Sequence, residues 1–267
     1  MSFTFKAKTL EAYTFKTLSE VLQNILTDVC FDLTPDGIRL LTVDNKTPPQ
    51  LMVHLDLQRN NFEEYLCLKN TTIGINLQHL YKLLKSIKKK DRVTFYITSQ
   101  NPSQLGICSE TESGQEYYSN IKIQKLQKVD TKPPTGYGFP NLIPTNSFQK
   151  MCKDMTSISK IIKIFSKGSY ITFSCEFDGM YTRHAPFGTL DDTSEDEEYE
   201  DWFNTKSLTQ LIKISGLNQK LKVYTTNDLP LKLSIQVGLL GVLDIFIKSR
   251  PQIEHQDKHH SSHYDSY

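Results

Sequence analysis

The sequence lacks several features that would place it in a familiar class of protein. Its five cysteines are scattered and odd in number, with no CxxC pair, which argues against a disulfide framework and for reduced thiols. No stretch approaches 18 apolar residues, and the first ten residues contain no apolar run of signal length. We therefore expect an intracellular protein that is neither secreted nor inserted in a membrane.

The chain also lacks an excess of charge and a recognisable catalytic motif. Its formal net charge is +1, so any nucleic-acid binding must come from cations sorted onto one surface. It contains no GxxxxGK[ST] phosphate loop, and serine, histidine and aspartate occur in no recognised catalytic spacing. We expect no enzyme activity, no cofactor and no functional metal site, including at the histidine-rich end (His255, His259, His260 and His263).

A basic amphipathic stretch, by contrast, occurs twice. Asn76–Tyr96, NLQHLYKLLKSIKKKDRVTFY, aligns without gaps on Asn204–Tyr224, NTKSLTQLIKISGLNQKLKVY, at an offset of 128. Each stretch predicts a helix, a short turn and a strand, with leucine and isoleucine on one helical face and lysine on the other. Two further helices, predicted within residues 13–30 and 146–158, align at an offset of 133. The chain is therefore predicted to be a tandem repeat of two strand-rich halves, each with two lysine-bearing helices.

Composition divides the chain into four segments. Residues 129–144 contain four prolines and two glycines without periodicity, which is typical of a linker. The predicted divisions are a first domain at 1–128, a connector at 129–144, a second domain at 145–251 and a disordered polar tail at 252–267. The acidic run at 191–201, with eight carboxylates in eleven residues, is interpreted as a solvated surface insertion.

Four short motifs stand between and within these elements in a fixed order. They are Asp28–Asp32 (DVCFD), Gly74–Leu77 (GINL), Phe148–Asp154 (FQKMCKD) and Asp228–Leu231 (DLPL). Their order and spacing, together with the repeat, resemble the sliding clamps of the proliferating cell nuclear antigen (PCNA) family over about residues 5–251. The resemblance implies an α+β fold, the DNA clamp fold, in which two tandem strand-rich domains each contribute two helices to the lining of a central hole. It also implies a homotrimeric ring around duplex DNA.

Lysine suits a protein that holds the phosphate backbone without reading bases, because its ammonium is a point charge on a flexible stem. Matching the family's inner surface onto this chain gives eight DNA-facing candidates: Lys16, Lys82, Lys85, Lys89, Lys150, Lys153, Lys206 and Lys213. The first helix departs from the family, with Thr17 and Gln23 where basic residues are usual. A single helix of this kind is more often simply solvated, but four in a repeat favour DNA. Lys88–Lys90 either extend this surface or solvate a turn.

The resemblance further implies a groove for short peptides of replication proteins. The matching residues are Val43, Pro133, Tyr137, Pro230 and Phe246. Such a groove accepts a helical turn with apolar anchors beside an extended segment. The chain departs from the family in the loop at 45–50 (NKTPPQ) and at Lys248 and Ser249. Tyr137 and Phe246, taken alone, are equally typical of ordinary half-buried aromatics.

Ring closure would need two sheet edges that pair between subunits. Family matching places them at about residues 117–124 and 178–184, with interface candidates Tyr117, Ile121, Ile123, Met180 and Thr182. Pairing each edge with the next subunit would remove two exposed strand edges.

The predicted function is that of a DNA polymerase processivity factor that encircles duplex DNA and tethers replication and repair proteins. Its expected partners are double-stranded DNA, a DNA polymerase and other replication proteins with short peptide motifs, and a clamp loader. The alternative is a monomeric or dimeric DNA-binding accessory factor with the same fold but no closed ring. The near-neutral charge favours the ring, because an unclosed factor would need a stronger basic face. We expect it at replicating DNA, in the nucleus of a eukaryote or in a cytoplasmic viral factory.

Overall fold

The computed structural model describes residues 2–44, 51–191, 193 and 195–261, with only the backbone described for residues 256–261. Within this part of the chain, antiparallel strands form three sheets. The sequence departure noted at 45–50 lies outside the described residues.

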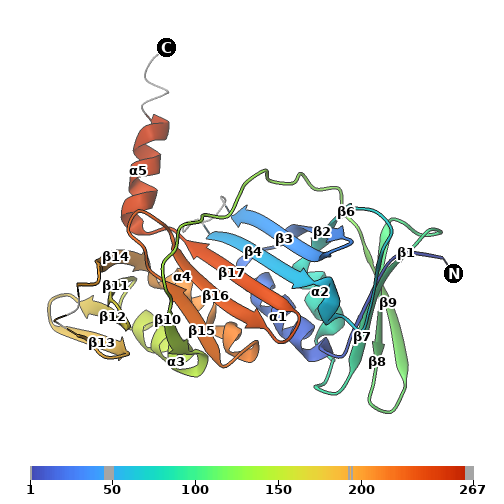
Figure 1. Cartoon of the computed structure of the whole chain (residues 1–267), viewed down its shortest axis with the longest axis horizontal. Helices are drawn as coiled ribbons and strands as arrows, with labels where there is room; N and C mark the ends of the chain where they lie inside the picture. The colour runs from blue at the N-terminus through green and yellow to red at the C-terminus, as the bar shows by residue number, and fades with distance from the viewer. Residues whose placement is uncertain (1, 45–50, 192, 194, 262–267) are drawn as a thin grey trace.

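Each half of the chain contributes one sheet of its own. The N-terminal sheet has the order β5–β1–β7–β8–β9, and the C-terminal sheet has the order β13–β12–β11–β14. The strands of the first are β1 (Phe3–Thr9), β5 (Glu64–Cys67), β7 (Arg92–Thr98), β8 (Gln104–Glu110) and β9 (Glu116–Lys122). Those of the second are β11 (Ile161–Lys167), β12 (Tyr170–Phe177), β13 (Tyr181–Phe187) and β14 (Glu198–Asn204). Strands β9 and β13 lie at opposite ends of the molecule (Figure 1).

The third sheet is shared by both halves and lies between the other two. Its order is β10–β15–β16–β17–β4–β3–β2–β6. Its strands are β2 (Asp28–Thr34), β3 (Gly37–Asp44), β4 (Leu51–Gln58), β6 (Thr71–Asn76), β10 (Asn141–Pro144), β15 (Lys220–Tyr224), β16 (Leu231–Val237) and β17 (Gly241–Ile247). The halves join where β4 pairs with β17, from Leu51 opposite Ile247 to Leu57 opposite Gly241. One continuous ladder of backbone hydrogen bonds therefore connects the two domains.

Strand β4 illustrates why this sheet has a core face and an outer face. Its sequence, LMVHLDLQ, alternates, and Leu51, Val53, Leu55 and Leu57 are all buried. Side chains of successive strand residues point to opposite faces, so Met52, His54 and Asp56 share the other side. The polar positions of the sequence therefore define the outer face of the central sheet.

The helices form one layer that crosses both halves. Helix α1 (Ala12–Ile25) packs against α2 (Leu77–Leu84) and against the 3₁₀ segment η2 (Ile212–Gly216). Helix α3 (Thr145–Thr156) packs against α4 (Thr205–Thr209) and also against η2. A short 3₁₀ turn, η1 (Arg59–Asn61), precedes β5. Both halves thus bury apolar helical faces in the same core.

The two aligned basic stretches do not form identical helices. In α2 the side chain of Asn76 accepts a hydrogen bond from the backbone N–H of His79 at 3.0 Å, which caps the first turn. In the second copy, α4 ends at Thr209, and η2 follows with the sequence IKISG. Isoleucine, serine and glycine have lower helix propensity than the leucines and lysines of α2, which explains the break. The first predicted helix is also shorter than expected, because Asp28 already belongs to β2.

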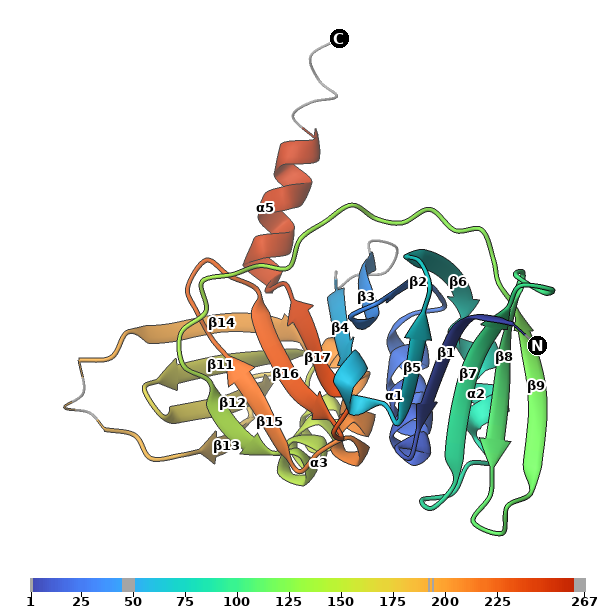
Figure 2. The ribbon, with the colours of Figure 1, turned by 45° about the vertical axis from the view of Figure 1, so that its right-hand side comes forward.

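Several strands were not predicted from the sequence. Strands β6, β11 and β14 were missed, and β14 includes the last four residues of the acidic run. The second predicted edge strand begins later than expected, because Asp178 and Gly179 adopt positive φ in a turn and β13 starts at Tyr181. Residues 125–140 contain no helix or strand, and they arch over the central sheet to reach β10 (Figure 2). We call residues 125–140 the connector. The sequence predicted a connector at residues 129–144, but residues 141–144 form β10.

The C-terminal segment corrects the expectation of a disordered tail from residue 252. Helix α5 (Arg250–Ser261) projects away from the sheets (Figure 1). The backbone N–H of Ser249 donates to the side-chain oxygen of Gln252 at 3.0 Å, and the N–H of Gln252 points back to the Ser249 hydroxyl at 3.4 Å. This reciprocal pair is a capping box, an N-terminal helix signal that the sequence interpretation overlooked.

Candidate functional site

Exposed lysines follow the outer surface of the helix layer in both halves of the chain. They are Lys82 in α2, Lys85 at its C-terminal cap, Lys150 and Lys153 in α3, Lys206 in α4 and Lys213 in η2. The opposite faces of the same helices are buried, as at Leu80 and Leu84 of α2. The structure therefore places six of the eight candidate lysines on one helix layer with their side chains exposed.

The acidic side chains of this layer are already paired. Helix α1 contains only Glu20 and α3 only Asp154, while α2, α4 and η2 contain none. The ammonium of Lys213 lies 2.9 Å from a Glu20 oxygen, and Arg183 on β13 lies 2.8 Å from Asp154. The hydrogen bond to Glu20 raises the pKa of Lys213, which stays charged at neutral pH. The helix layer as a whole thus presents a positive surface.

Lys16 has a different position from the other helical lysines. Its ammonium donates to the backbone carbonyl of Ile87 at 3.2 Å and lies 5.0 Å from the centre of the Tyr13 ring. The side chain is half-buried, and it ties α1 to the segment that follows α2. Lys16 therefore makes contacts within the chain, and its contact with DNA stays a prediction.

The lysine run after α2 lies in a turn. Its backbone is held by Asp91, whose carboxylate accepts from the N–H of Lys88 at 2.8 Å. The ammonium of Lys90 lies 2.6 Å from Glu112 in the turn between β8 and β9. Lys89 is exposed beside them. Of the two interpretations of this run, solvation of the turn fits Lys90, whereas Lys89 stays a predicted DNA contact.

A second candidate site lies where the connector crosses the outer face of the central sheet. The hydroxyl of Tyr137 donates to the backbone carbonyl of Pro230 at 2.8 Å, and its ring centre is 6.1 Å from that of Phe246. Val43 lies in the same cross-strand row as Phe246, with Met52 between them. The structure therefore brings together three of the five predicted groove residues, Tyr137, Pro230 and Phe246, and places Val43 two strands away on the same face. Pro133, the fifth, is a half-buried residue of the connector.

Lys232 lies at the centre of this cluster and was not predicted. It is directly opposite Phe246 on one side and Tyr224 on the other. Its ammonium lies 5.7, 5.0 and 5.5 Å from the ring centres of Tyr137, Tyr224 and Phe246. A cation within about 6 Å of an aromatic face is attracted by the ring's quadrupole. We call these four side chains the aromatic seat.

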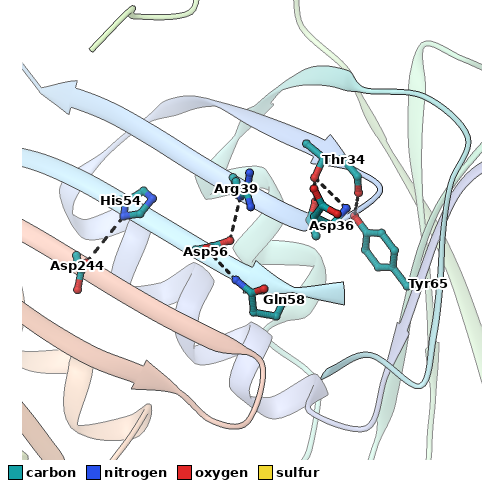
Figure 3. A network of polar contacts seen from close by, with 9 residues as sticks. Thr34, Asp36, Arg39, His54, Asp56, Gln58, Tyr65 and Asp244 are labelled. Atoms are coloured by element: carbon teal, nitrogen blue, oxygen red, sulfur yellow. Dashed lines mark hydrogen bonds and ion pairs between the residues drawn. The ribbon is translucent and has the colours of Figure 1, made fainter. Parts of the chain in front are cut away.

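A carboxylate beside the aromatic seat balances the charge of Lys232. Asp244 accepts from the Lys232 ammonium at 3.0 Å. His54 Nδ1 lies 3.9 Å from the same carboxylate oxygen (Figure 3). Burial works to raise the pKa of Asp244, but the polar groups of His54, Ser234 and Lys232 outweigh it, so the pKa lies below its ordinary value. Asp244 is therefore ionised at neutral pH, as Lys232 requires.

A more exposed pair occupies the neighbouring row of the same face. Asp56 accepts from Arg39 at 3.2 Å and from Gln58 at 2.8 Å (Figure 3). The Arg39 side chain is 46% exposed, whereas those of Lys232 and Asp244 are 19% and 14% exposed. The two ion pairs thus differ chiefly in burial, and this difference allows a controlled comparison.

We expect Asp244→Asn to lower the free energy of unfolding by about 2 kcal/mol at pH 7, because it leaves the largely buried Lys232 without its counter-ion. Asp56→Asn should cost less than about 1 kcal/mol, since exposed pairs contribute little. The Asp244 contribution is present above the unfolded pKa of about 3.9 and is lost as the pH falls through the lower folded pKa. Urea unfolding at pH 7 and below pH 4 measures both effects. Equal losses for the two variants at pH 7 would contradict this account.

The predicted ring edges correspond to two end strands. Strand β9 ends the N-terminal sheet and β13 ends the C-terminal sheet, and each has one side without a strand partner within the described residues. Tyr117 and Thr182 are exposed on them. Ile121, by contrast, is buried in the chain's own core and Ile123 packs against it, and Met180 lies in the turn before β13. Ile121 and Ile123 are therefore not exposed edge residues, and Met180, although 79% exposed, is not part of the strand.

Other kinds of site are not seen in the described part of the chain. Among residues 2–44, 51–191, 193 and 195–255, no three histidine, cysteine or acidic side chains group as metal ligands would. None of the helices there combines the length and apolar composition needed to cross a bilayer. Burial raises the pKa of the Cys152 thiol to about 12, so this cysteine is an unreactive core residue.

Comparison with known proteins agrees with this geometry. The family model described as proliferating cell nuclear antigen, N-terminal domain, matches residues 4–132, and the model of the C-terminal domain matches residues 137–250. A probable DNA polymerase sliding clamp 1 of Paramecium bursaria Chlorella virus 1 is 28% identical over 253 residues, covering 91% of this chain and 95% of the relative. Proliferating cell nuclear antigen of Chaetomium thermophilum is 26% identical over 254 residues, covering 91% and 96%. The predicted α+β clamp fold of two tandem domains is thereby confirmed, and the chain belongs to the proliferating cell nuclear antigen family of sliding clamps.

Proposed function

We propose that this chain is a DNA polymerase processivity factor that closes into a homotrimeric ring around duplex DNA. The observation that carries the proposal is the helix layer, which runs through both halves and presents exposed lysines while its own acids are paired. Point charges of this kind hold phosphates and carry no sequence information, which suits a protein that must move along any DNA. The chain itself performs no catalytic step in this proposal.

Closure of the ring replaces tight binding. A ring that encircles DNA cannot dissociate sideways, so each phosphate contact can be weak. The free end strands β9 and β13 lie at opposite ends of one chain, which supports head-to-tail association. The alternative, an unclosed accessory factor, would leave both edges free and would rely on a few lysines for all its affinity. We therefore favour the ring.

Partner proteins are proposed to bind the groove beneath the connector, which Val43, Tyr137, Pro230 and Phe246 line. A DNA polymerase, other replication and repair proteins and a clamp loader would present short peptide motifs to the apolar surface beneath the connector. The site of action is replicating DNA, in the nucleus of a eukaryotic host or in a cytoplasmic viral factory.

Retention on circular DNA tests encirclement directly. After loading onto a nicked plasmid, by a clamp-loader ATPase or at high protein concentration, we expect the chain to stay bound in 0.5 M salt. Cutting the plasmid once should release it, because a ring slides off a free end. Gel filtration of the complex before and after cutting measures this. Equal salt-resistant retention on circular and linear DNA would contradict encirclement and favour direct binding.

A further inference from the structure

The second half of the acidic run borders a cavity that the proposed function does not use. This cavity of about 610 Å³ lies between the end of the connector, the turn from β11 to β12 and the segment that leads into β14. Asp196, Glu197 and Glu198 line it, and the described residues around it include no lysine, arginine or histidine. None of the four side chains of the aromatic seat lines it. We call this cavity the acidic cleft.

Hydrogen bonds order the acidic cleft without cancelling all of its charge. The side-chain amide of Asn227 donates to the Glu197 carboxylate and, at 3.2 Å, to the backbone carbonyl of Glu198. The ammonium of Lys167 lies 3.2 Å from a Glu198 oxygen and balances that carboxylate. An amide is neutral, so the bond from Asn227 leaves the negative charge of Glu197 in place.

A glycine turn fixes the third acid of the cleft. Gly168 has a φ of +55°, and a Cβ at this position would clash with the Asp196 carboxylate. The side-chain amide of Asn141 donates to the Gly168 carbonyl at 3.1 Å, which ties the turn to β10. The walls of the cleft are therefore ordered before a ligand arrives, which lowers the entropic cost of binding.

A buried hydroxyl of the cleft lacks a hydrogen-bond partner. Tyr199 lines the cleft opposite Ser166 and is only 4% exposed. No group within the described residues hydrogen-bonds to its hydroxyl, although a buried hydroxyl left unpaired is costly. Burial raises the pKa of Tyr199, so the hydroxyl keeps its proton and its oxygen can accept from a charged N–H donor. Independently of the acids, the cleft thus suits a ligand that carries N–H groups.

An exposed aromatic ring completes the set of groups around the cleft. Phe139, which lines it, is 100% exposed. The face of such a ring attracts a cation, and a planar guanidinium can stack on it. Carboxylates, a hydroxyl oxygen and an aromatic face are together suited to arginine, which has five N–H donors in one plane. Lysine has three donors and no plane to stack.

We propose that the acidic cleft is a second docking site, separate from the partner groove, which takes an arginine side chain from a basic segment of a partner protein. Glu197 and the Tyr199 hydroxyl accept from the guanidinium, and Phe139 stacks on its face. Charge complementarity selects this kind of partner, because the same carboxylates repel the phosphates of nucleic acid. Part of the acidic run is then a recognition element as well as a solvated surface.

Short peptides test the proposal on the full chain. The probes are a glycine peptide with two arginines and its matched forms with lysine or with citrulline, the neutral isostere of arginine. Each is titrated into the isotope-labelled chain at about 0.05 M salt and followed by NMR. The arginine peptide should bind about threefold more tightly than the lysine peptide and at least about tenfold more tightly than the citrulline peptide, because hydrogen bonds to charged groups are the stronger ones.

Variants of the lining residues locate the binding. Asp196→Asn with Glu197→Gln keeps the shape of the cleft, removes two charges and should weaken the arginine peptide at least about tenfold. Tyr199→Phe removes an oxygen that has no partner within the described residues, so the chain should stay folded while the peptide binds about threefold more weakly. Phe139→Ala should cost about twofold to fivefold in affinity.

The matched control removes two charges from another part of the molecule. Glu63 and Glu64 are exposed at the start of β5 in the N-terminal sheet, and Glu63→Gln with Glu64→Gln should change the affinity by less than about twofold. The proposal is overturned if the arginine peptide does not bind, if the citrulline peptide binds as tightly, if Tyr199→Phe binds like the unmodified chain, or if the control loses as much as the cleft variant. None of these results depends on ring closure, which the particle mass tests separately.

Discussion

Replacing Met180 and Tyr181 by aspartate should reduce the particle in solution from about three chains of 30.7 kDa to one. Both side chains are exposed at the β13 edge, with exposed fractions of 79% and 51%. In a ring they would be covered by the β9 edge of the next subunit. A carboxylate buried there without a partner costs about 2 kcal/mol or more, and every 1.4 kcal/mol weakens association about tenfold. Light scattering at micromolar concentration measures the change.

The head-to-tail geometry makes a sharper version of this experiment possible. A second variant, Tyr117→Asp with Tyr118→Asp, should block the β9 edge in the same way and should also be monomeric alone. A mixture of the two variants retains one intact edge of each kind, so it should form a dimer and nothing larger. Leu239→Asp is the matched control, since Leu239 is 77% exposed in the turn between β16 and β17. An unmodified chain that stays monomeric, or a mixture that forms trimers, would contradict the proposed ring.

Charge reversal on the helix layer should impair clamp-dependent DNA synthesis without affecting assembly. We expect Lys82→Glu with Lys85→Glu, and separately Lys150→Glu with Lys153→Glu, to reduce processive synthesis about tenfold or more near 0.15 M salt. These four lysines are exposed, and the structure gives them no ion pair within the described residues, so their charge is available for phosphates. Lys213 is left out because Glu20 already neutralises it. Primer extension on a long single-stranded template measures the loss.

The control for this experiment is a pair of lysines away from the helices. Lys69 lies in the loop between β5 and β6, and Lys222 lies on the outer face of the central sheet. Reversing both changes the net charge by the same amount and should leave synthesis within about twofold of the unmodified chain. Where weak direct DNA binding is measurable, its salt slope should fall by about 0.9 for each contacting lysine removed. Equal losses from both kinds of variant would show that net charge, and no particular surface, is responsible.

The helix layer was largely predictable from the sequence because its signal is local. The buried positions of α1 and α2, such as Leu22 and Leu80, follow the 3.6-residue period that the sequence displays. The exposed lysines follow from the same period. The break between α4 and η2 was missed, because the alignment with α2 treats isoleucine and leucine alike although they differ in helix propensity. Periodicity therefore predicts which face is buried better than it predicts how long a helix runs.

The aromatic seat could not be predicted in the same way. Its residues come from three strands and the connector, and their proximity depends on strand register, which no local period contains. Tyr137 and Phe246 were proposed only by resemblance to the family. A signal for Lys232 and Asp244 was nevertheless present, since each interrupts an apolar strand at a position that alternation assigns to the outer face. Opposite charges on neighbouring strands were the feature to notice.

The pairing of β4 with β17 has a consequence for how the chain folds during its synthesis on the ribosome. The two strands are separated by about 190 residues, and β4 cannot gain its second neighbour until β17 has been made. At about 5 to 20 residues per second, this interval is about 10 to 40 s. During that time the apolar underside of an incomplete sheet and one open edge of β4 remain available to other nascent chains. The final strand of the second domain thus completes the first, and a chain truncated before residue 241 would leave both domains unfinished.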